Sequence, residues 1–163
     1  MTNYFKNKID KDYANNPATK IRWDKTLEFM SRGQNFKSAL DIGDRTGLTE
    51  MMENEYSVSF DNTKGDLDNL ELKGNYDLVT SFEVLEHLFN HLFNLEQINN
   101  VLNQNGYLFL STPMAKPDFY GQKNISMKCL KDQFMHCLNL QDLRFCGTDI
   151  LEFTHFYFTP AAY

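Results

Sequence analysis

The sequence predicts an α/β fold, a Rossmann-like three-layer sandwich built around a mainly parallel β-sheet. Short apolar runs that read as buried strands alternate with amphipathic helical stretches over the first two thirds of the chain. The first of these strands ends in an acidic residue, and a glycine-bearing turn follows it. The chain has 163 residues, of which 42 % are hydrophobic, and this length suits one domain with one core.

The predicted elements follow one another as helix, strand, helix, strand, strand, helix and strand. Their expected ranges are 18–32, 37–42, 48–55, 56–60, 77–82, 84–102 and 107–111. The clearest of the helices is 84–102, whose apolar residues recur at spacings of three and four: Leu88, Leu92, Leu95, Ile98 and Leu102. Residues 62–75 are polar and contain no strand pattern. Beyond Pro113 the pattern weakens to a helical turn at 140–145 and a single strand at 150–158.

The whole chain, 1–163, is expected to form one domain, with an N-terminal arm at 1–17, a core at 18–113 and a variable C-terminal segment at 114–163. Lys and Arg total 16 against 22 Asp and Glu, a net charge of −6, and the basic residues do not cluster. This disfavours nucleic acid as a partner. The three cysteines lack the spacing of a zinc site. With no apolar signal core and no membrane-spanning run, we expect a soluble, cytoplasmic protein that does not bind membranes.

Acidic residues and glycines occupy the ends of the first two predicted strands. Asp41 is followed by Gly43 and Gly47, and glycine lets a ligand approach the backbone closely. The same pattern also fits a tight strand-to-helix turn that binds nothing. Asp61 lies 20 residues after Asp41, where an acid can accept hydrogen bonds from ribose hydroxyls, or it is a surface aspartate. Asp66 and Leu67 fit either a solvated turn or an adenine contact, the carboxylate facing the amino group and the leucine the ring.

The most specific motif is Tyr-Asp-Leu-Val-Thr-Ser-Phe-Glu-Val-Leu-Glu-His-Leu at 76–88, joined through the next helix to a strand at 107–111. Together with the glycine turn, it resembles the class I S-adenosylmethionine-dependent methyltransferases of the small-molecule type. The resemblance covers roughly residues 37–113. It implies S-adenosylmethionine as cofactor, a small-molecule acceptor, and three groups of site residues. These are Asp41, Gly43 and Gly47 at the methionine end; Asp61, Asp66 and Leu67 at the nucleoside end; and Ser81, Phe82, Glu83, Glu86 and His87 beside the sulfonium and the acceptor.

The sequence departs from this family pattern in three places. Arg45 replaces the middle glycine of the turn, so it either narrows the cleft or swings outward with its loop. Only four residues separate Asp61 from Asp66, so the edge strand of the usual seven is expected to be missing. The family ends in an antiparallel strand pair, of which the sequence predicts only one strand.

Several readings of the site remain open at this point. His87 is the preferred general base because its ordinary pKa suits neutral pH, although it also fits a packing role. Glu83, Glu86 and His87 are spaced to share one helix face, where they would bind a metal with His136 or His155, as in some RNA-terminal 2′-O-methyltransferases. A further alternative is a non-catalytic module with a degenerate cofactor site. The glycine spacing disfavours a nicotinamide-dependent oxidoreductase. The sequence leaves open whether the chain forms homo-oligomers.

Overall fold

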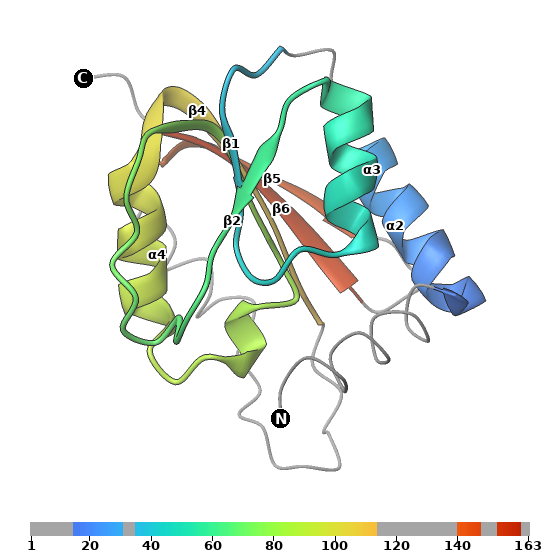
Figure 1. Cartoon of the computed structure of the whole chain (residues 1–163), viewed down its shortest axis with the longest axis horizontal. Coiled ribbons are helices and arrows are strands. Elements are labelled where there is room, and N and C mark those ends of the chain that lie inside the picture. Colours follow the sequence, from blue (N-terminus) through green and yellow to red (C-terminus); the bar gives the residue numbers. More distant parts are fainter. Residues whose placement is uncertain (1–14, 31–34, 114–139, 148–152, 161–163) are drawn as a thin grey trace.

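The protein is a three-layer α/β sandwich in which one helix covers one face of a β-sheet and two helices cover the other (Figure 1). The computed structural model describes residues 15–30, 35–113, 140–147 and 153–160. Its helices are α2 (Pro17–Met30), α3 (Gly47–Tyr56), the 3₁₀ turn η1 (Leu85–His87) and α4 (His91–Val101). Its strands are β1 (Ala39–Asp41), β2 (Phe60–Asn62), β3 (Tyr76–Phe82), β4 (Leu102–Pro113), β5 (Leu140–Gly147) and β6 (Phe153–Pro160). Residues 1–14 of the predicted arm and His136 lie outside the described residues.

The strand order in the sheet is β2-β1-β3-β4-β6-β5. The first four strands are parallel, with Leu40 of β1 paired to Asp61 of β2 and Val79 of β3. The last two strands, β6 and β5, are antiparallel to their neighbours. This arrangement confirms the predicted fold class. It also confirms the shortened sheet, because residues 63–75, between β2 and β3, form neither a helix nor a strand.

The C-terminal region corrects one prediction. Residues 140–145 were expected to form a helical turn and 150–158 a single strand, yet the structure has the antiparallel pair β5 and β6. The register runs from Leu140 opposite Pro160 to Gly147 opposite Thr154. The leucines of β5 have a helix-like spacing in the sequence. The backbone hydrogen bonds of β5 nevertheless go to β6, a segment further along the chain, and this pairing decides the structure.

The predicted helix at 84–102 is also corrected, because the structure divides it. The 3₁₀ turn η1 ends at His87, Leu88 is extended (φ −93°, ψ 140°), and α4 begins at His91. Asp68 holds this break: its carboxylate accepts a hydrogen bond of 2.6 Å from the backbone N–H of Asn90, and its carbonyl accepts one of 3.3 Å from the Asn90 side chain. Since a 3₁₀ turn has nearly the period of an α-helix, the apolar spacing alone does not reveal the division.

The two faces of the sheet carry separate hydrophobic clusters, which hold the helices against the strands. The α4 face packs Leu95, Ile98 and Val101 against Val79 and Leu108. The opposite face packs residues of α2 and α3 against the other side of the same strands: Trp23, Phe29, Met30, Leu48 and Met52 on Ala39, Leu78 and Phe109. Within this second cluster, Phe29 meets Phe109 edge to face at 5.8 Å between ring centroids. None of the described helices has the length and apolar character needed to cross a bilayer.

Candidate functional site

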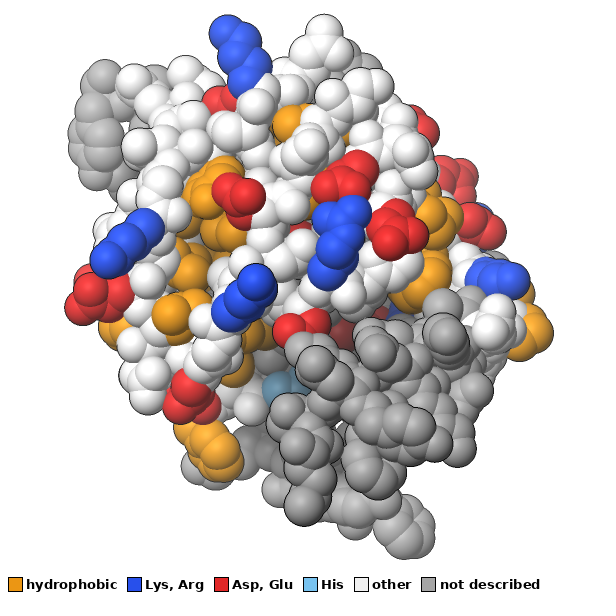
Figure 2. Space-filling model, viewed as in Figure 1, with side chains coloured by type: hydrophobic (Ala, Val, Ile, Leu, Met, Phe, Trp, Pro, Cys, Tyr) orange, Lys and Arg blue, Asp and Glu red, His pale blue; other side chains and the backbone are white. Residues whose placement is uncertain are grey.

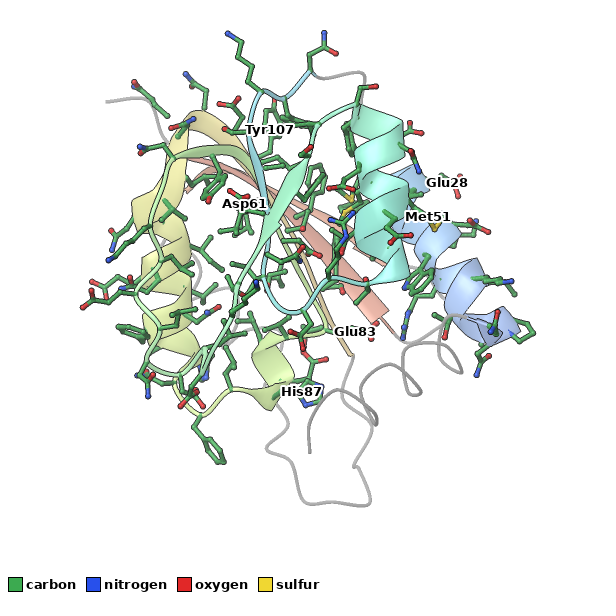
Figure 3. The ribbon with its side chains drawn as sticks, in the orientation of Figure 1. Glu28, Met51, Asp61, Glu83, His87 and Tyr107 are labelled. Atoms are coloured by element: carbon green, nitrogen blue, oxygen red, sulfur yellow. The ribbon has the colours of Figure 1, made fainter. Side chains whose placement is uncertain are left out.

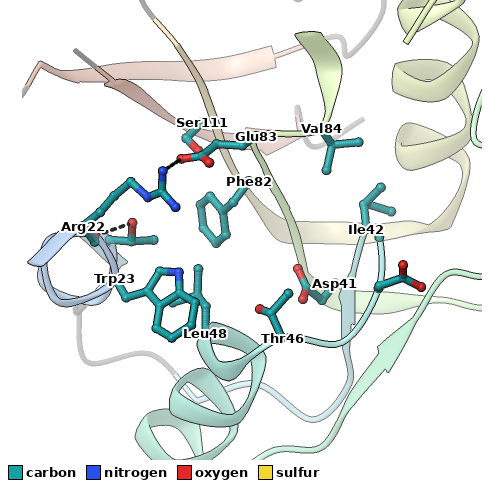
Figure 4. Close-up of a pocket in the computed structure, with 13 residues that line it drawn as sticks. Arg22, Trp23, Asp41, Ile42, Thr46, Leu48, Phe82, Glu83, Val84 and Ser111 are labelled. Atoms are coloured by element: carbon teal, nitrogen blue, oxygen red, sulfur yellow. Dashed lines mark hydrogen bonds and ion pairs between the residues drawn. The ribbon is translucent and has the colours of Figure 1, made fainter. Parts of the chain in front are cut away.

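A cleft of about 200 Å³ opens at the carboxyl ends of β1, β3 and β4, with α2 forming one wall (Figure 4). Four segments supply its lining, and this is where a doubly wound sheet normally binds its ligands. The main contributors are Arg22 and Trp23 from α2, Asp41 and Gly43 from the end of β1 and its turn, Phe82 and Glu83 from the end of β3, and Ser111 from β4.

The carboxylate of Asp41 joins β1 to three neighbouring elements beside this cleft. Thr80 donates a hydrogen bond of 2.7 Å to Oδ1, Thr49 donates one of 2.6 Å to Oδ2, and the amide of Asn62 lies 3.3 Å from Oδ2. Asp41 is only 7 % exposed, and burial raises its pKa to about 6, although the hydrogen bonds oppose that rise. The oxygens of Asp41 therefore fix β1 relative to β2, β3 and α3.

The turn after β1 keeps its glycine at the cleft. Gly43 has a φ of +112°, a backbone conformation that L side chains rarely adopt. Its N–H donates a hydrogen bond of 2.7 Å to Thr63 Oγ1, and its carbonyl accepts one of 3.3 Å from Asn62. An added Cβ would meet Val84 Cγ2 at 3.9 Å, an ordinary van der Waals contact, so the cost of a side chain here lies in the backbone conformation. Hydrogen bonds hold the turn on one side, and on the other side Gly43 lines the cleft.

Arg45 does not obstruct this cleft. Its guanidinium forms an ion pair with Glu53 of α3, which includes a hydrogen bond of 3.0 Å from Nη1 to Oε1. The same Glu53 oxygen accepts a hydrogen bond of 2.9 Å from the backbone N–H of Phe60. Arg45 lines a second cavity, of about 620 Å³, beside β2. Of the two expectations for this residue, the structure shows the outward one.

Gly47 has a packing role at the beginning of α3. A Cβ at this position would lie 2.8 Å from two carbons of the Trp23 ring, so only glycine lets the indole lie this close. Trp23 is the single tryptophan of the chain, and it is buried while also lining the cleft. The contact joins α2 to the glycine turn.

A charged pair crosses the cleft between α2 and the end of β3. Arg22 Nη1 lies 2.9 Å from Glu83 Oε1, and their side chains are 15 % and 23 % exposed (Figure 4). Glu83 has a φ of +57°, and its N–H donates a hydrogen bond of 3.0 Å to the carbonyl of Ser111. Burial raises the pKa of the Glu83 carboxyl, while the charge of Arg22 opposes the rise. A non-glycine residue held in this conformation stores strain, which is common at functional sites.

Glu86 and His87 lie next to the cleft but do not line it. Burial raises the pKa of Glu86 to about 7, with a further contribution from the charge of Glu83. Glu86 Oε2 has no hydrogen-bond partner among the described residues. His87 is 66 % exposed, with Nε2 4.0 Å from Glu86 Oε1. Figure 3 shows Glu83 and His87 at the same end of the molecule.

The expectation that Glu83, Glu86 and His87 share one helix face is wrong. Glu83 precedes η1 and has a left-handed backbone, and η1 comprises only three residues. In the described ranges, which exclude His136, no three His, Cys, Asp or Glu side chains are grouped closely enough to hold a metal ion. His155 lies in β6, opposite Ser111 of β4.

Asp61 lies in the middle of the three-residue strand β2 rather than after its end. The hydroxyl of Tyr76 donates a hydrogen bond of 2.9 Å to Asp61 Oδ2. Both residues line the cavity beside β2, and in Figure 3 Asp61 is well separated from Glu83. The sheet turns Asp61 and its neighbour Asn62 to opposite faces, because successive side chains of a strand alternate. Asn62 is the one that reaches Asp41.

Three further predicted site residues lie away from the cleft lining. Asp66 caps its own turn, accepting hydrogen bonds of 3.1 Å from the backbone N–H of Asp68 and from the side chain of Asn69. Leu67 packs against the core on the α4 face. Ser81 is fully buried, and its hydroxyl has no partner among the described residues. The cleft therefore unites Asp41, Gly43, Phe82 and Glu83 of the predicted set, and it adds Arg22 and Trp23.

Residues 15–149 match the family described as Methyltransferase domain. Among solved structures, the N-methyltransferase NodS from Bradyrhizobium japonicum WM9 has a TM-score of 0.67 at 16 % identity, over 90 % of this chain and 99 % of NodS. Its complex with S-adenosyl-l-homocysteine has a TM-score of 0.65 at 14 % identity, over 95 % of this chain and 91 % of that one. An S-adenosylmethionine-dependent methyltransferase from Clostridium acetobutylicum ATCC 824 has a TM-score of 0.62 at 11 % identity, with 98 % and 99 % covered. No curated protein matches the chain significantly.

Proposed function

Because the chain belongs to the methyltransferase-domain family and is an S-adenosylmethionine-dependent methyltransferase, we propose that it methylates a small-molecule acceptor and holds the methyl donor in the cleft beside α2. The observation that carries the proposal is the cleft itself. It lies at the carboxyl ends of three parallel strands, where sheets of this kind bind ligands, and Gly43 forms part of its wall.

The cleft fits the methionine end of the cofactor. Gly43 lines the cleft without a side chain, and Phe82 and Trp23 supply aromatic rings of the kind that attract cations. We propose that Asp61 contacts the ribose by exchanging one partner. The hydroxyl of Tyr76 now donates to its carboxylate, and a ribose hydroxyl would donate to the same oxygen. Asp66 remains a proposed adenine contact, one that requires its turn to open.

When bound, S-adenosylmethionine supplies a methyl group on a positively charged sulfur, ready for in-line displacement. The protein's part is to align the acceptor and exclude water. Trp23 and Phe82 form an apolar wall that limits water in the cleft. Asp41 holds the turn in place through its bonds to Thr49 and Thr80.

For an acceptor that must lose a proton, we propose Glu86 as the general base, acting through His87. A pKa of about 7 leaves a carboxylate able to take up a proton at neutral pH. His87, exposed and with Nε2 4.0 Å from Glu86 Oε1, would carry the proton from the acceptor to this carboxylate. If Glu86 has this role, replacing it with glutamine removes the ascending limb near pH 7 from the pH–rate profile. A profile that keeps this limb contradicts the assignment.

Charge supports a small molecule over RNA as the acceptor. The net charge is −6, and on the face shown in Figure 2 the Lys and Arg side chains stand singly among acidic ones. A phosphate backbone binds to clustered basic residues instead.

The first test is isothermal titration calorimetry of the full chain with S-adenosylhomocysteine. Gly43→Ala adds a methyl group to the cleft at a positive φ. Asn105→Ala is its control, because Asn105 also has a positive φ, of +63°, and is an exposed residue that lines neither cavity. We expect Gly43→Ala to weaken binding about tenfold, and Asn105→Ala to leave it unchanged. Wild-type protein that does not bind the probe, or equal losses in both variants, would overturn the proposed site.

A further inference from the structure

The residue that precedes α4 is bound to a turn 22 residues earlier in the chain. The carboxylate of Asp68 accepts a hydrogen bond of 2.6 Å from the backbone N–H of Asn90, and the Asp68 carbonyl accepts one of 3.3 Å from the Asn90 side chain. The Asn90 side chain forms no capping hydrogen bond with its own helix. Asp68 therefore fixes the point at which α4 begins, and its negative charge suits the N-terminal end of a helix.

Asp68 is itself held in place by its own turn. Its backbone N–H donates a hydrogen bond of 3.1 Å to Asp66 Oδ1, and the N–H of Asn69 donates one of 3.2 Å to the Asp66 carbonyl. Leu67, between the two aspartates, packs against the core on the α4 face. The carboxylate of Asp68 thus extends from a fixed backbone, so it can hold Asn90 rather than follow it.

The segment between η1 and α4 ends in an exposed residue just before Asn90. The N–H groups of His87 and Leu88 donate to carbonyls three residues earlier, so these bonds close η1 on itself. Leu88 is partly buried against the core, whereas Phe89 is 97 % exposed. The hydrogen bonds to Asp68 therefore hold this segment at the point where its own packing ends.

The same segment carries the proposed base. The side chain of Glu86 is 14 % exposed, and Thr112 donates a hydrogen bond to its carboxylate. The titratable and charged side chains that act on it are His87, with Nε2 at 4.0 Å, Glu83 and Arg22. Burial is the largest cause of the raised pKa of Glu86, so an outward displacement of η1 would expose the carboxyl and lower this pKa.

We propose that Asp68 is a positioning residue for the Glu86–His87 pair: by holding Asn90, it keeps η1 in place and the Glu86 carboxyl buried. Asp68 acts through Asn90 and through the extended residues before it, not through contact with the reacting groups. This inference rests on the proposed function, because it deepens the assignment of Glu86 as the base.

The test follows the Glu86 carboxyl by NMR during a pH titration of the full chain, with isotope-labelled glutamate. Glu86→Gln identifies the signal, because that variant lacks it. Asp68→Ala removes the acceptor of the Asn90 N–H, whereas Asp68→Asn keeps an oxygen in the same place. Asp24→Ala is the matched control, since Asp24 is an exposed aspartate on α2.

We expect Asp68→Ala to lower the pKa of Glu86 from about 7 toward 4.5, by about one pH unit or more. Asp68→Asn should restore most of the wild-type value, and Asp24→Ala should not change it. A loss of stability alone would leave the pKa of the folded protein where it is. If Asp68→Ala does not fold, Asn90→Ala decides, because it removes the 3.3 Å bond and should lower the pKa in the same direction.

Two results would contradict the proposal, and they differ in what else they overturn. A raised wild-type pKa that stays the same in Asp68→Ala, or in Asn90→Ala where that variant decides, would overturn the positioning role and leave Glu86 as the base. A wild-type pKa near 4.5 would overturn both the base and its positioning. Binding of the methyl donor in the cleft is measured separately, by the calorimetric titration with S-adenosylhomocysteine.

Discussion

Asp41 should make the protein less stable as pH rises, which is the opposite of the effect of an ordinary ion-paired aspartate. Replacing Asp41 with asparagine should remove this dependence of stability on pH. Burial raises the pKa of this carboxyl from 3.8 to about 6. Between these values the folded protein holds a proton that the unfolded chain has lost. Stability from this group is therefore present at low pH and falls as pH rises from about 4 to about 6.

The size of the effect follows from the shift. A difference of about two pKa units corresponds to about 3 kcal/mol at about 1.4 kcal/mol per unit. Asp41 is 7 % exposed, so solvent screening reduces the figure little. The hydrogen bonds from Thr49 and Thr80 change in the variant at every pH, and that part of the difference cancels when two pH values are compared. Relative to the wild type, the free energy of unfolding of Asp41→Asn should therefore rise by about 3 kcal/mol between pH 4 and pH 7.

Urea unfolding followed by circular dichroism at pH 4, 5, 6 and 7 measures this difference. Asp77→Asn is the control, because the pKa of Asp77 is shifted in the opposite direction. Its carboxylate accepts hydrogen bonds from Asn103, at 2.8 Å, and from the backbone N–H of Lys37, at 2.9 Å, and these bonds lower the pKa of Asp77. Asp77 stabilises the fold above its ordinary pKa and loses this stabilisation only below about pH 4, so the deficit of its variant should stay nearly constant from pH 4 to pH 7. A flat difference for Asp41→Asn, or one that turns against asparagine with rising pH, refutes the reasoning.

Three further substitutions test contacts around the cleft. Gly47→Ala places a methyl group against the Trp23 ring, so it should lower the free energy of unfolding by about 1–3 kcal/mol and change the tryptophan emission. An unaltered spectrum and stability would show that α2 does not pack as described. Tyr56→Phe removes the hydrogen bond to Met30 and should lower the free energy of unfolding by about 1 kcal/mol; a thermal melt that superimposes on the wild type contradicts this. Glu53→Gln should destabilise the fold at neutral pH and approach the wild type as pH falls from about 4.5 toward 2, because hydrogen bonds from a guanidinium and a backbone amide lower the pKa of Glu53 to about 2; a deficit that stays constant with pH argues against it.

Local patterns predicted β1, β3 and β4 because these strands are apolar and are followed by turns, whereas the second strand, expected at 56–60, begins only at Phe60 since α3 extends to Tyr56. They failed where the partner of a segment is distant in sequence. The leucines of β5 have helical spacing, but β6 supplies its hydrogen bonds. The division at Leu88 was hidden by a continuous apolar period, although Asn90, a residue type common at helix N-termini, marks the true beginning of α4.

The position of the candidate cleft at the edge of the sheet was predictable, but most of the side chains that line it were not. Asp41, Gly43, Phe82 and Glu83 follow directly from the ends of strands. Arg22 was missed because it reaches the cleft from a helix some 20 residues earlier in the chain. Its neighbour Trp23 gave a useful signal, because it is a lone tryptophan on an amphipathic helix. A glycine at the beginning of a later helix, Gly47, indicates where such a ring can pack against the backbone.

The three-residue strand β2 ends the sheet on one side, and its outer margin faces a hollow containing Lys64, Glu71 and Lys73. So short a margin presents few free backbone groups to an incoming peptide, and charged side chains beside it make annealing with another β-ribbon unfavourable. The absence of the usual edge strand has therefore not left an edge that pairs readily with a strand of another molecule. Mutations that lengthen β2 or neutralise those lysines would be the ones to seed fibrous association.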